Sequence, residues 1–170
     1  MSYLVGIDPT LVRTNTEGPA FTLGTIGQIL DSSAGTKTYK YVQYVDGTGP
    51  LSLAVGDVVI YVDDSGYGAH QVTADVSDIT GKEIGAGVTA VAMTAVTHDL
   101  GYFWIQIRGA ATLAVDIGGA GSDGDGLTAT GAADKGLTLA LDAGAAADSV
   151  NVCAIIVDET ADEIICMFPE

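Results

Sequence analysis

The sequence predicts an all-β protein: a compact barrel or sandwich of about nine to twelve short strands with an extended N-terminal arm. Three observations support this fold class. Apolar residues make up 48% of the 170 residues, which is enough for a buried core in a single domain. The 23 glycines divide the chain into short apolar runs joined by turns. Only 16% of the residues are charged, and no long amphipathic helical pattern occurs.

The first 20 residues differ from the rest and are expected to form the arm. Pro9 and Pro19 interrupt this segment, and proline lacks the N–H group that the interior of a sheet requires. Its scattered apolar residues would be exposed to solvent if the arm were free, so we expect the arm to dock onto a neighbouring molecule. These candidate contact residues are Tyr3, Leu4, Val5, Ile7, Leu11 and Val12. The β-rich domain is then residues 21–170.

Strand signals follow from Phe21 onwards. β-branched and aromatic residues mark the first strands, and clusters of Asp, Gly, Ser and Pro mark the turns between them. The expected strands are Thr38–Val45, Val58–Val62, Gln71–Thr73 and Val88–Val96, with turns at Asp46–Pro50 and Asp63–Gly66.

The best-defined strand lies between Gly101 and Gly109 and alternates strictly. Phe103, Ile105 and Ile107 point to one side. Tyr102, Trp104, Gln106 and Arg108 point to the other side. Three interpretations of Tyr102, Trp104 and Arg108 stay open: a protein interface, a strand buried on both faces, or a sugar-stacking platform.

The C-terminal third continues the β pattern around a glycine-rich segment at Gly118–Gly126. The expected strands are Thr112–Ile117, Leu127–Thr130, Leu137–Leu141 and a hairpin of Val150–Val157 with Ile164–Phe168, joined by a loop at Asp158–Asp162. Ala143–Ala147 is the only plausible helix and is too short to form alone. Cys153 and Cys166 face each other in one register of the hairpin, which allows a disulfide. Two buried thiols are the preferred interpretation for a cytosolic product.

The charge balance excludes several classes of partner. There are 22 acidic and 6 basic residues, a formal net charge of −16. We therefore expect no binding to nucleic acid or to an anionic membrane surface, because both need clustered Lys and Arg. No stretch of 18 apolar residues predicts a membrane span, and no targeting segment is visible at the N-terminus.

No grouping of residues predicts catalysis, a cofactor or a metal. His70 and His98 are 28 positions apart and lack an evident nucleophile. Asp63 and Asp64 would point apart on a strand. The glycine-rich segment formally matches calcium-repeat and dinucleotide patterns, but it is a single copy without a following helix. A surface loop is the preferred interpretation, with a single Ca²⁺ held by Asp123 and Asp125 as the alternative.

With these residues described, the chain resembles the small capsid decoration (cement) proteins of tailed bacteriophages. The resemblance follows the order of parts over about 150 residues rather than an invariant motif. The similar segments are Leu23–Thr25, Tyr39–Val45, Leu53–Val58, Val76–Asp78, Gly87–Val88, Gly101–Gly109 and Asn151–Ala154.

This resemblance implies a non-enzymatic virion protein, made in the host cytoplasm, that binds the outside of the assembled capsid. The implied partner is the major capsid protein, and the implied assembly is a trimer or dimer on the shell. The arm residues named above, with Tyr102, Trp104 and Arg108, are then the expected contact residues. The family offers no catalytic residues to carry over. The alternative is a tail- or fibre-associated adhesion module that binds a host glycan or receptor.

Overall fold

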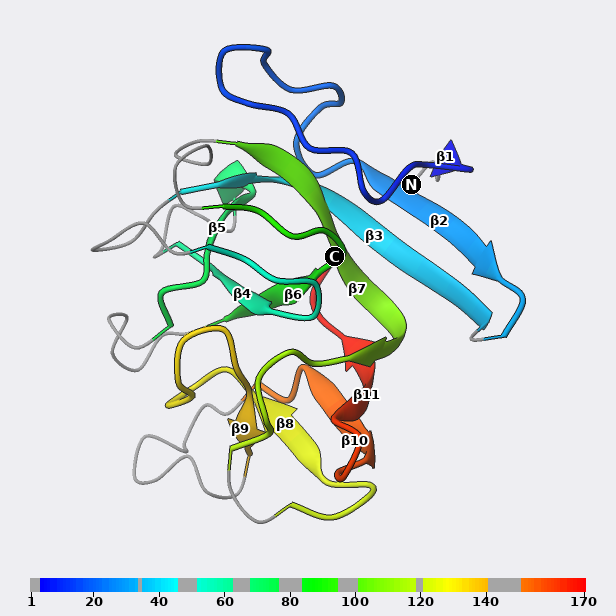
Figure 1. The fold of residues 1–170 in the computed structure, drawn as a ribbon, viewed down its shortest axis with the longest axis vertical. Coiled ribbons are helices and arrows are strands. Elements are labelled where there is room, and N and C mark those ends of the chain that lie inside the picture. Colours follow the sequence, from blue (N-terminus) through cyan, green and yellow to red (C-terminus); the bar gives the residue numbers. More distant parts are fainter. Residues whose placement is uncertain are drawn as a thin grey trace.

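The computed structural model describes residues 4–33, 35–45, 52–62, 68–76, 84–94, 101–118, 121–140 and 151–170. Eleven strands in these residues form a single sheet, so the all-β prediction and its strand number are confirmed (Figure 1). In chain order they are β1 (Leu4–Val5), β2 (Ile26–Asp31), β3 (Gly35–Tyr44), β4 (Val58–Tyr61), β5 (Gln71–Thr73), β6 (Gly85–Thr89), β7 (Tyr102–Thr112), β8 (Gly126–Thr128), β9 (Thr138–Leu139), β10 (Ala154–Asp158) and β11 (Glu163–Met167).

Five of these strands close into a barrel in the order β3, β5, β4, β6, β7 and back to β3. The β3–β5 pair is parallel, and the other neighbours are antiparallel. The long strands β3 and β7 pair from Thr38↔Arg108 to Gln43↔Tyr102. Closure satisfies the backbone groups that an open sheet would expose at its edges.

The alternation predicted for β7 is confirmed. Phe103, Ile105 and Ile107 belong to the main hydrophobic core, whereas Tyr102 and Trp104 belong to a separate cluster on the other side of the strand. Tyr39 and Tyr41 of β3 join that second cluster. Both sides of β7 are therefore buried in this region.

Four further strands extend the sheet beyond β7 in the order β11, β10, β8, β9. They form the lower part of the molecule in Figure 1. The predicted C-terminal hairpin is confirmed as β10 and β11, which pair from Ala154↔Cys166 to Asp158↔Glu163. Ile156 and Ile164 of this hairpin, with Leu127 of β8, are buried in the main core.

Most predicted strands differ in bounds from the observed ones, and three predictions need comment. The Val88–Val96 run is split: β6 ends at Thr89, and Met93 instead forms an isolated bridge to Leu53. The predicted strand Thr112–Ile117 is wrong, because β7 ends at Thr112 and residues 113–117 are irregular. Asp162 holds this irregular segment: its backbone carbonyl accepts from the Leu113 N–H (3.0 Å), and its carboxylate accepts from the Ile117 N–H (3.1 Å). The Leu137–Leu141 strand is shortened to Thr138–Leu139. The predicted turns at Asp46–Pro50 and Asp63–Gly66 and the alanine-rich patch lie outside the described residues.

Candidate partner-binding surfaces

The N-terminal arm lies along its own β domain, at the upper edge of the view in Figure 1. Its first strand, β1, pairs in parallel with β2 through Leu4↔Gly27 and Val5↔Gln28. Further along, Arg13 and Tyr102 exchange two backbone hydrogen bonds of 2.8 and 2.7 Å. The arm therefore occupies backbone donors and acceptors of two strands that lie far apart in the sequence.

Beneath the arm lies an aromatic group that we call the arm cluster. It consists of Tyr39, Tyr41, Tyr102 and Trp104, covered by Ile7, Leu11, Phe21, Leu23, Ile29 and Ala90. Trp104 is 0% exposed, and its ring lies 5.2 Å from Phe21 and 5.1 Å from Tyr41. Tilted ring pairs at this spacing stabilise by about 0.5–1.5 kcal/mol beyond burial. The structure thus favours the interpretation of Trp104 as a core residue, since a sugar-stacking platform needs an exposed ring.

The nine predicted contact residues do not form one exposed surface in the isolated chain. Ile7, Leu11, Tyr102 and Trp104 meet in the arm cluster, and Val12 packs against the main core. Leu4 and Val5 form β1, and Tyr3 lies outside the described residues. Arg108 lies elsewhere, half exposed, with Nε 3.1 Å from Oε1 of Glu170.

One edge of β2 is only partly covered. In the described residues β1 pairs with β2 at Gly27 and Gln28, whereas β2 continues to Asp31. Leu30 in this continuation is 81% exposed, the largest exposed fraction among the described large apolar side chains. The periodicity of the sequence did not predict the uncovered edge of β2, because periodicity cannot show which edge of a strand has a partner.

A second open surface, which we call the hairpin face, lies on the outer side of β10 and β11. Burial alternates along both strands: Ile156, Ile164 and Cys166 are buried, whereas Val157 and Ile165 are 45% and 40% exposed. The hairpin face comprises Ile155, Val157, Glu163, Ile165 and Met167, with their β7 neighbours Arg108, Ala110 and Thr112. The sequence predicted the two strands of this hairpin but assigned no side to their apolar residues, so the face was not predicted.

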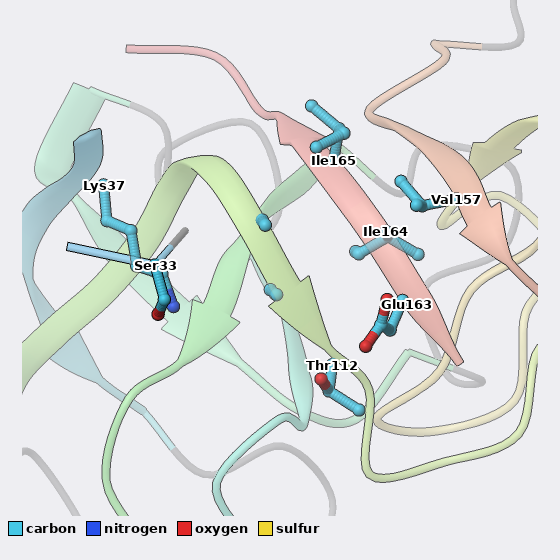
Figure 2. A pocket seen from close by; sticks show the side chains of 9 residues that line it. Ser33, Lys37, Thr112, Val157, Glu163, Ile164 and Ile165 are labelled. Carbon is cyan, nitrogen blue, oxygen red and sulfur yellow. The ribbon is translucent and has the colours of Figure 1, made fainter. Parts of the chain in front are cut away.

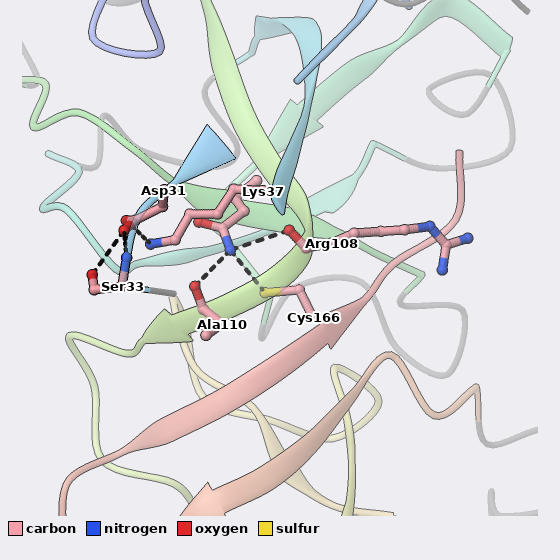
Figure 3. Close-up of polar contacts among 7 residues, drawn as sticks. Asp31, Ser33, Lys37, Arg108, Ala110 and Cys166 are labelled. Carbon is pink, nitrogen blue, oxygen red and sulfur yellow. Dashed lines mark hydrogen bonds and ion pairs between the residues drawn. The ribbon is translucent and has the colours of Figure 1, made fainter. Parts of the chain in front are cut away.

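A pocket of about 360 Å³ opens beside the hairpin face (Figure 2). Val157, Glu163 and Ile165 line it from the hairpin, and Ser33 and Lys37 line it from the β2–β3 hairpin. The ammonium of Lys37 lies 3.9 Å from a carboxylate oxygen of Asp31. Close by, the amide of Gln106 donates to the carbonyl of Ala110 at 2.9 Å, where β7 bends towards the C-terminal strands (Figure 3).

The two cysteines are free thiols, as the preferred interpretation predicted. Cys166 pairs in register with Ala154, so Cys153 lies one position away from the register that would put the two cysteines opposite each other. Burial raises the pKa of each thiol to about 12, and the neighbouring Cys153 adds to the effect on Cys166. Thiols that stay protonated at neutral pH are poor nucleophiles.

Two other titratable side chains, Lys40 and His70, are buried and partly buried, respectively. Lys40 is buried, and its Nζ donates to the Tyr61 hydroxyl at 2.8 Å. Burial lowers the pKa of Lys40, and a weaker attraction to Glu170 opposes this shift. His70 packs its ring directly over Gly24, where an added Cβ would lie 2.3 Å from Nε2. Desolvation lowers the pKa of His70, with a smaller contribution from Lys40.

The acidic residues of the glycine-rich segment bond to backbone donors. Asp125 accepts from the Ser122 N–H at 2.9 Å, and Asp123 accepts from the Glu159 N–H at 3.2 Å. These bonds fix a turn against the β10–β11 loop. Within the described part of the chain, no group of three or more His, Cys, Asp and Glu side chains is placed to hold a metal ion. His98, Asp63 and Asp64 lie outside that part.

Comparison of the chain with protein-family models, curated proteins and solved structures gave no match. Among the described residues, no helix has the length and apolar character needed to cross a membrane.

Proposed function

We propose that this chain is a non-enzymatic virion protein that binds the outside of an assembled phage capsid and stabilises it. The major capsid protein is the proposed partner. The proposal is supported by the resemblance of the chain to capsid decoration proteins and by the all-β fold. The net charge of −16 agrees with a location on the outer surface, where contact with the packaged genome is not required.

The observation that carries the proposal is the partly open edge of β2 beside the arm. β1 covers the edge at Gly27 and Gln28, and the stretch Ile29–Asp31 continues past it with Leu30 exposed. An uncovered strand edge pairs readily with an extended segment of another chain, and an exposed leucine beside it offers an apolar anchor. We assign capsid docking to this edge together with the arm.

Stabilisation of the shell then follows from mass action. A protein that binds the assembled shell and not its dissociated subunits lowers the free energy of the assembled state by its own binding free energy. Many copies, each bound with modest affinity, add up over the whole shell. No bond is made or broken in this activity.

The test uses purified heads of the phage that encodes the chain, stripped of this protein and then mixed with it. We expect the protein to sediment with the heads and to raise the temperature at which they release DNA. Leu30→Asp and deletion of residues 1–20 should each lower the bound fraction. Val55→Asp, at another exposed aliphatic residue, is the matched control and should bind normally.

Each variant is first checked for folding by circular dichroism, because deletion of the arm also uncovers Trp104. Failure of the unaltered protein to sediment with heads, together with binding to host cells, would contradict the proposal and favour the adhesion alternative. Normal occupancy by both the Leu30 variant and the deletion would show that docking does not use the β2 edge.

A further inference from the structure

The hairpin face is the outer side of four strands in register. Gly126 of β8 pairs with Ile155 of β10, which pairs with Ile165 of β11, which pairs with Ala110 of β7. This central row crosses the small sheet without a charged residue. Val157 beside it adds a further exposed aliphatic side chain. Contiguous exposed aliphatic side chains on a folded surface indicate a protein contact.

The charges on this face lie at its two ends. Glu163 pairs with Thr112 at one end of the β7–β11 ladder, and Arg108 pairs with Met167 at the other. The guanidinium of Arg108 has five N–H donors, so its contact with Glu170 leaves donors for a second carboxylate. Glu163 thus lies at one end of the face, where Lys37 lines the adjoining pocket, and Arg108 lies at the other end beside Glu170, with an apolar centre between them.

We propose that two copies of this chain associate through the hairpin face about a two-fold axis. The axis runs along the central row, perpendicular to the strands, in the plane between the two sheets. This arrangement packs Ile165 of one copy against Ile165 of the other and reverses the strand direction across the interface. Glu163 of each copy then approaches Arg108 of its partner.

The shape of the face agrees with this reversal. The pocket of about 360 Å³ lies at the Glu163 end of the face. At the Met167 end, Ile84 and Val152 are exposed beside a second pocket. Rotation about the axis places the Met167 end of one copy against the Glu163 end of its partner. A two-fold interface requires such self-complementarity, because each surface meets itself.

The chain's charge favours this location over others for self-association. Two copies that each carry a net charge of −16 repel one another wherever acidic residues face each other. The central row contains no acidic residue, and Arg108 offsets Glu163 across the axis. The proposal is independent of the capsid-binding proposal, because it concerns the purified chain alone.

The first test is sedimentation equilibrium of the purified full chain over a range of concentrations. We expect a reversible equilibrium between one and two chains. Ile165→Asp, at the centre of the face, should weaken association by about thirtyfold or more, as expected for a central interface residue. Val55→Asp is the matched control, at an exposed aliphatic residue outside the hairpin face, and should leave the equilibrium unchanged.

The second test exchanges the two charges. Arg108→Glu and Glu163→Arg should each weaken association, and the double variant should restore it, because the opposite charges meet again across the axis. Buried Trp104 reports folding of every variant. A chain that stays monomeric at all concentrations, a trimer, or a dimer that Ile165→Asp leaves intact would overturn the proposal. Failure of the double variant to recover would overturn the antiparallel arrangement.

Discussion

The two halves of strand β7 have opposite relations to the solvent. In the first half, the side that carries Tyr102 and Trp104 is covered by the arm, and the opposite side faces the main core. In the second half, the side that carries Arg108, Ala110 and Thr112 lies open beside Ile165. On this side of the sheet, Tyr102 and Trp104 are thus buried, whereas Ile165 is exposed.

This contrast teaches that a covering segment, rather than the residue types of a strand, decides which side of it becomes core. The arm covers the aromatic side of β7, and nothing in the described residues covers the hairpin face. Exposed aliphatic side chains consequently indicate a missing partner more strongly than exposed tyrosine or tryptophan does, because those residues carry a polar group that water can satisfy.

The largest effect is expected from Trp104→Ala. Removal of a fully buried tryptophan from between Phe21 and Tyr41 should lower the free energy of unfolding by about 3–5 kcal/mol. Chemical denaturation followed by circular dichroism measures the loss. Trp104→Phe is the control: Trp104 Nε1 has no hydrogen-bond partner in the described residues, so phenylalanine loses ring volume but no hydrogen bond. A loss below about 1 kcal/mol for Trp104→Ala would contradict its place in the core.

A smaller loss is expected from Gly109→Ala, at the junction between the two halves of β7. Gly109 has a φ of 94°, and an added Cβ would lie 2.8 Å from the carbonyl oxygen of Thr36. We expect a loss of about 2–3 kcal/mol, from the unfavourable backbone conformation and the clash with backbone. Gly131→Ala is the matched control, because Gly131 has a φ of 73° with no atom within 4 Å of the added Cβ. Equal losses at the two glycines would show that β3 yields to the methyl group.

Period-two alternation predicted the local structure well. It placed Phe103, Ile105 and Ile107 on one side of β7, and the turn residues between Val157 and Ile164 predicted the C-terminal hairpin. Both signals depend on residues close in sequence, which strand geometry fixes directly. The prediction that Cys153 and Cys166 are free, buried thiols is also confirmed; it was based on the expectation of a cytosolic product.

The surfaces could not be predicted in the same way, because they depend on contacts between distant segments. The arm residues Ile7 and Leu11 were expected to contact a neighbour, yet they cover Trp104 about 90 positions further along the chain. The sequence predicted the hairpin strands but not the outward direction of Ile155 and Ile165. No local sequence pattern predicts which side of a strand a segment distant in the sequence will cover.

A third prediction concerns His70 beside the base of the arm. Burial lowers the pKa of this imidazole, so the unfolded chain binds more protons than the folded one just below the ordinary histidine pKa of about 6.5. The free energy of unfolding is therefore unaffected by His70 above that pH, and it decreases as the pH falls from about 6.5 through the lowered pKa of the folded chain. His70→Asn, which tolerates the φ of 55°, should flatten the pH dependence of thermal unfolding between about pH 7 and 5. A pH dependence that His70→Asn leaves unchanged would contradict the assignment to His70.

The smallest effect is expected from Ile165→Thr in the open half. Because the side chain is 40% exposed and threonine keeps the β-branched shape, the free energy of unfolding of the monomer should change by less than about 0.5 kcal/mol. The measurement must be made at low protein concentration, since association stabilises the folded chain by mass action. A difference that grows with concentration would locate the contribution of Ile165 between copies. A loss above about 1.5 kcal/mol at every concentration would instead mean that the monomer itself buries this side chain, and the contrast between the two halves of β7 would disappear.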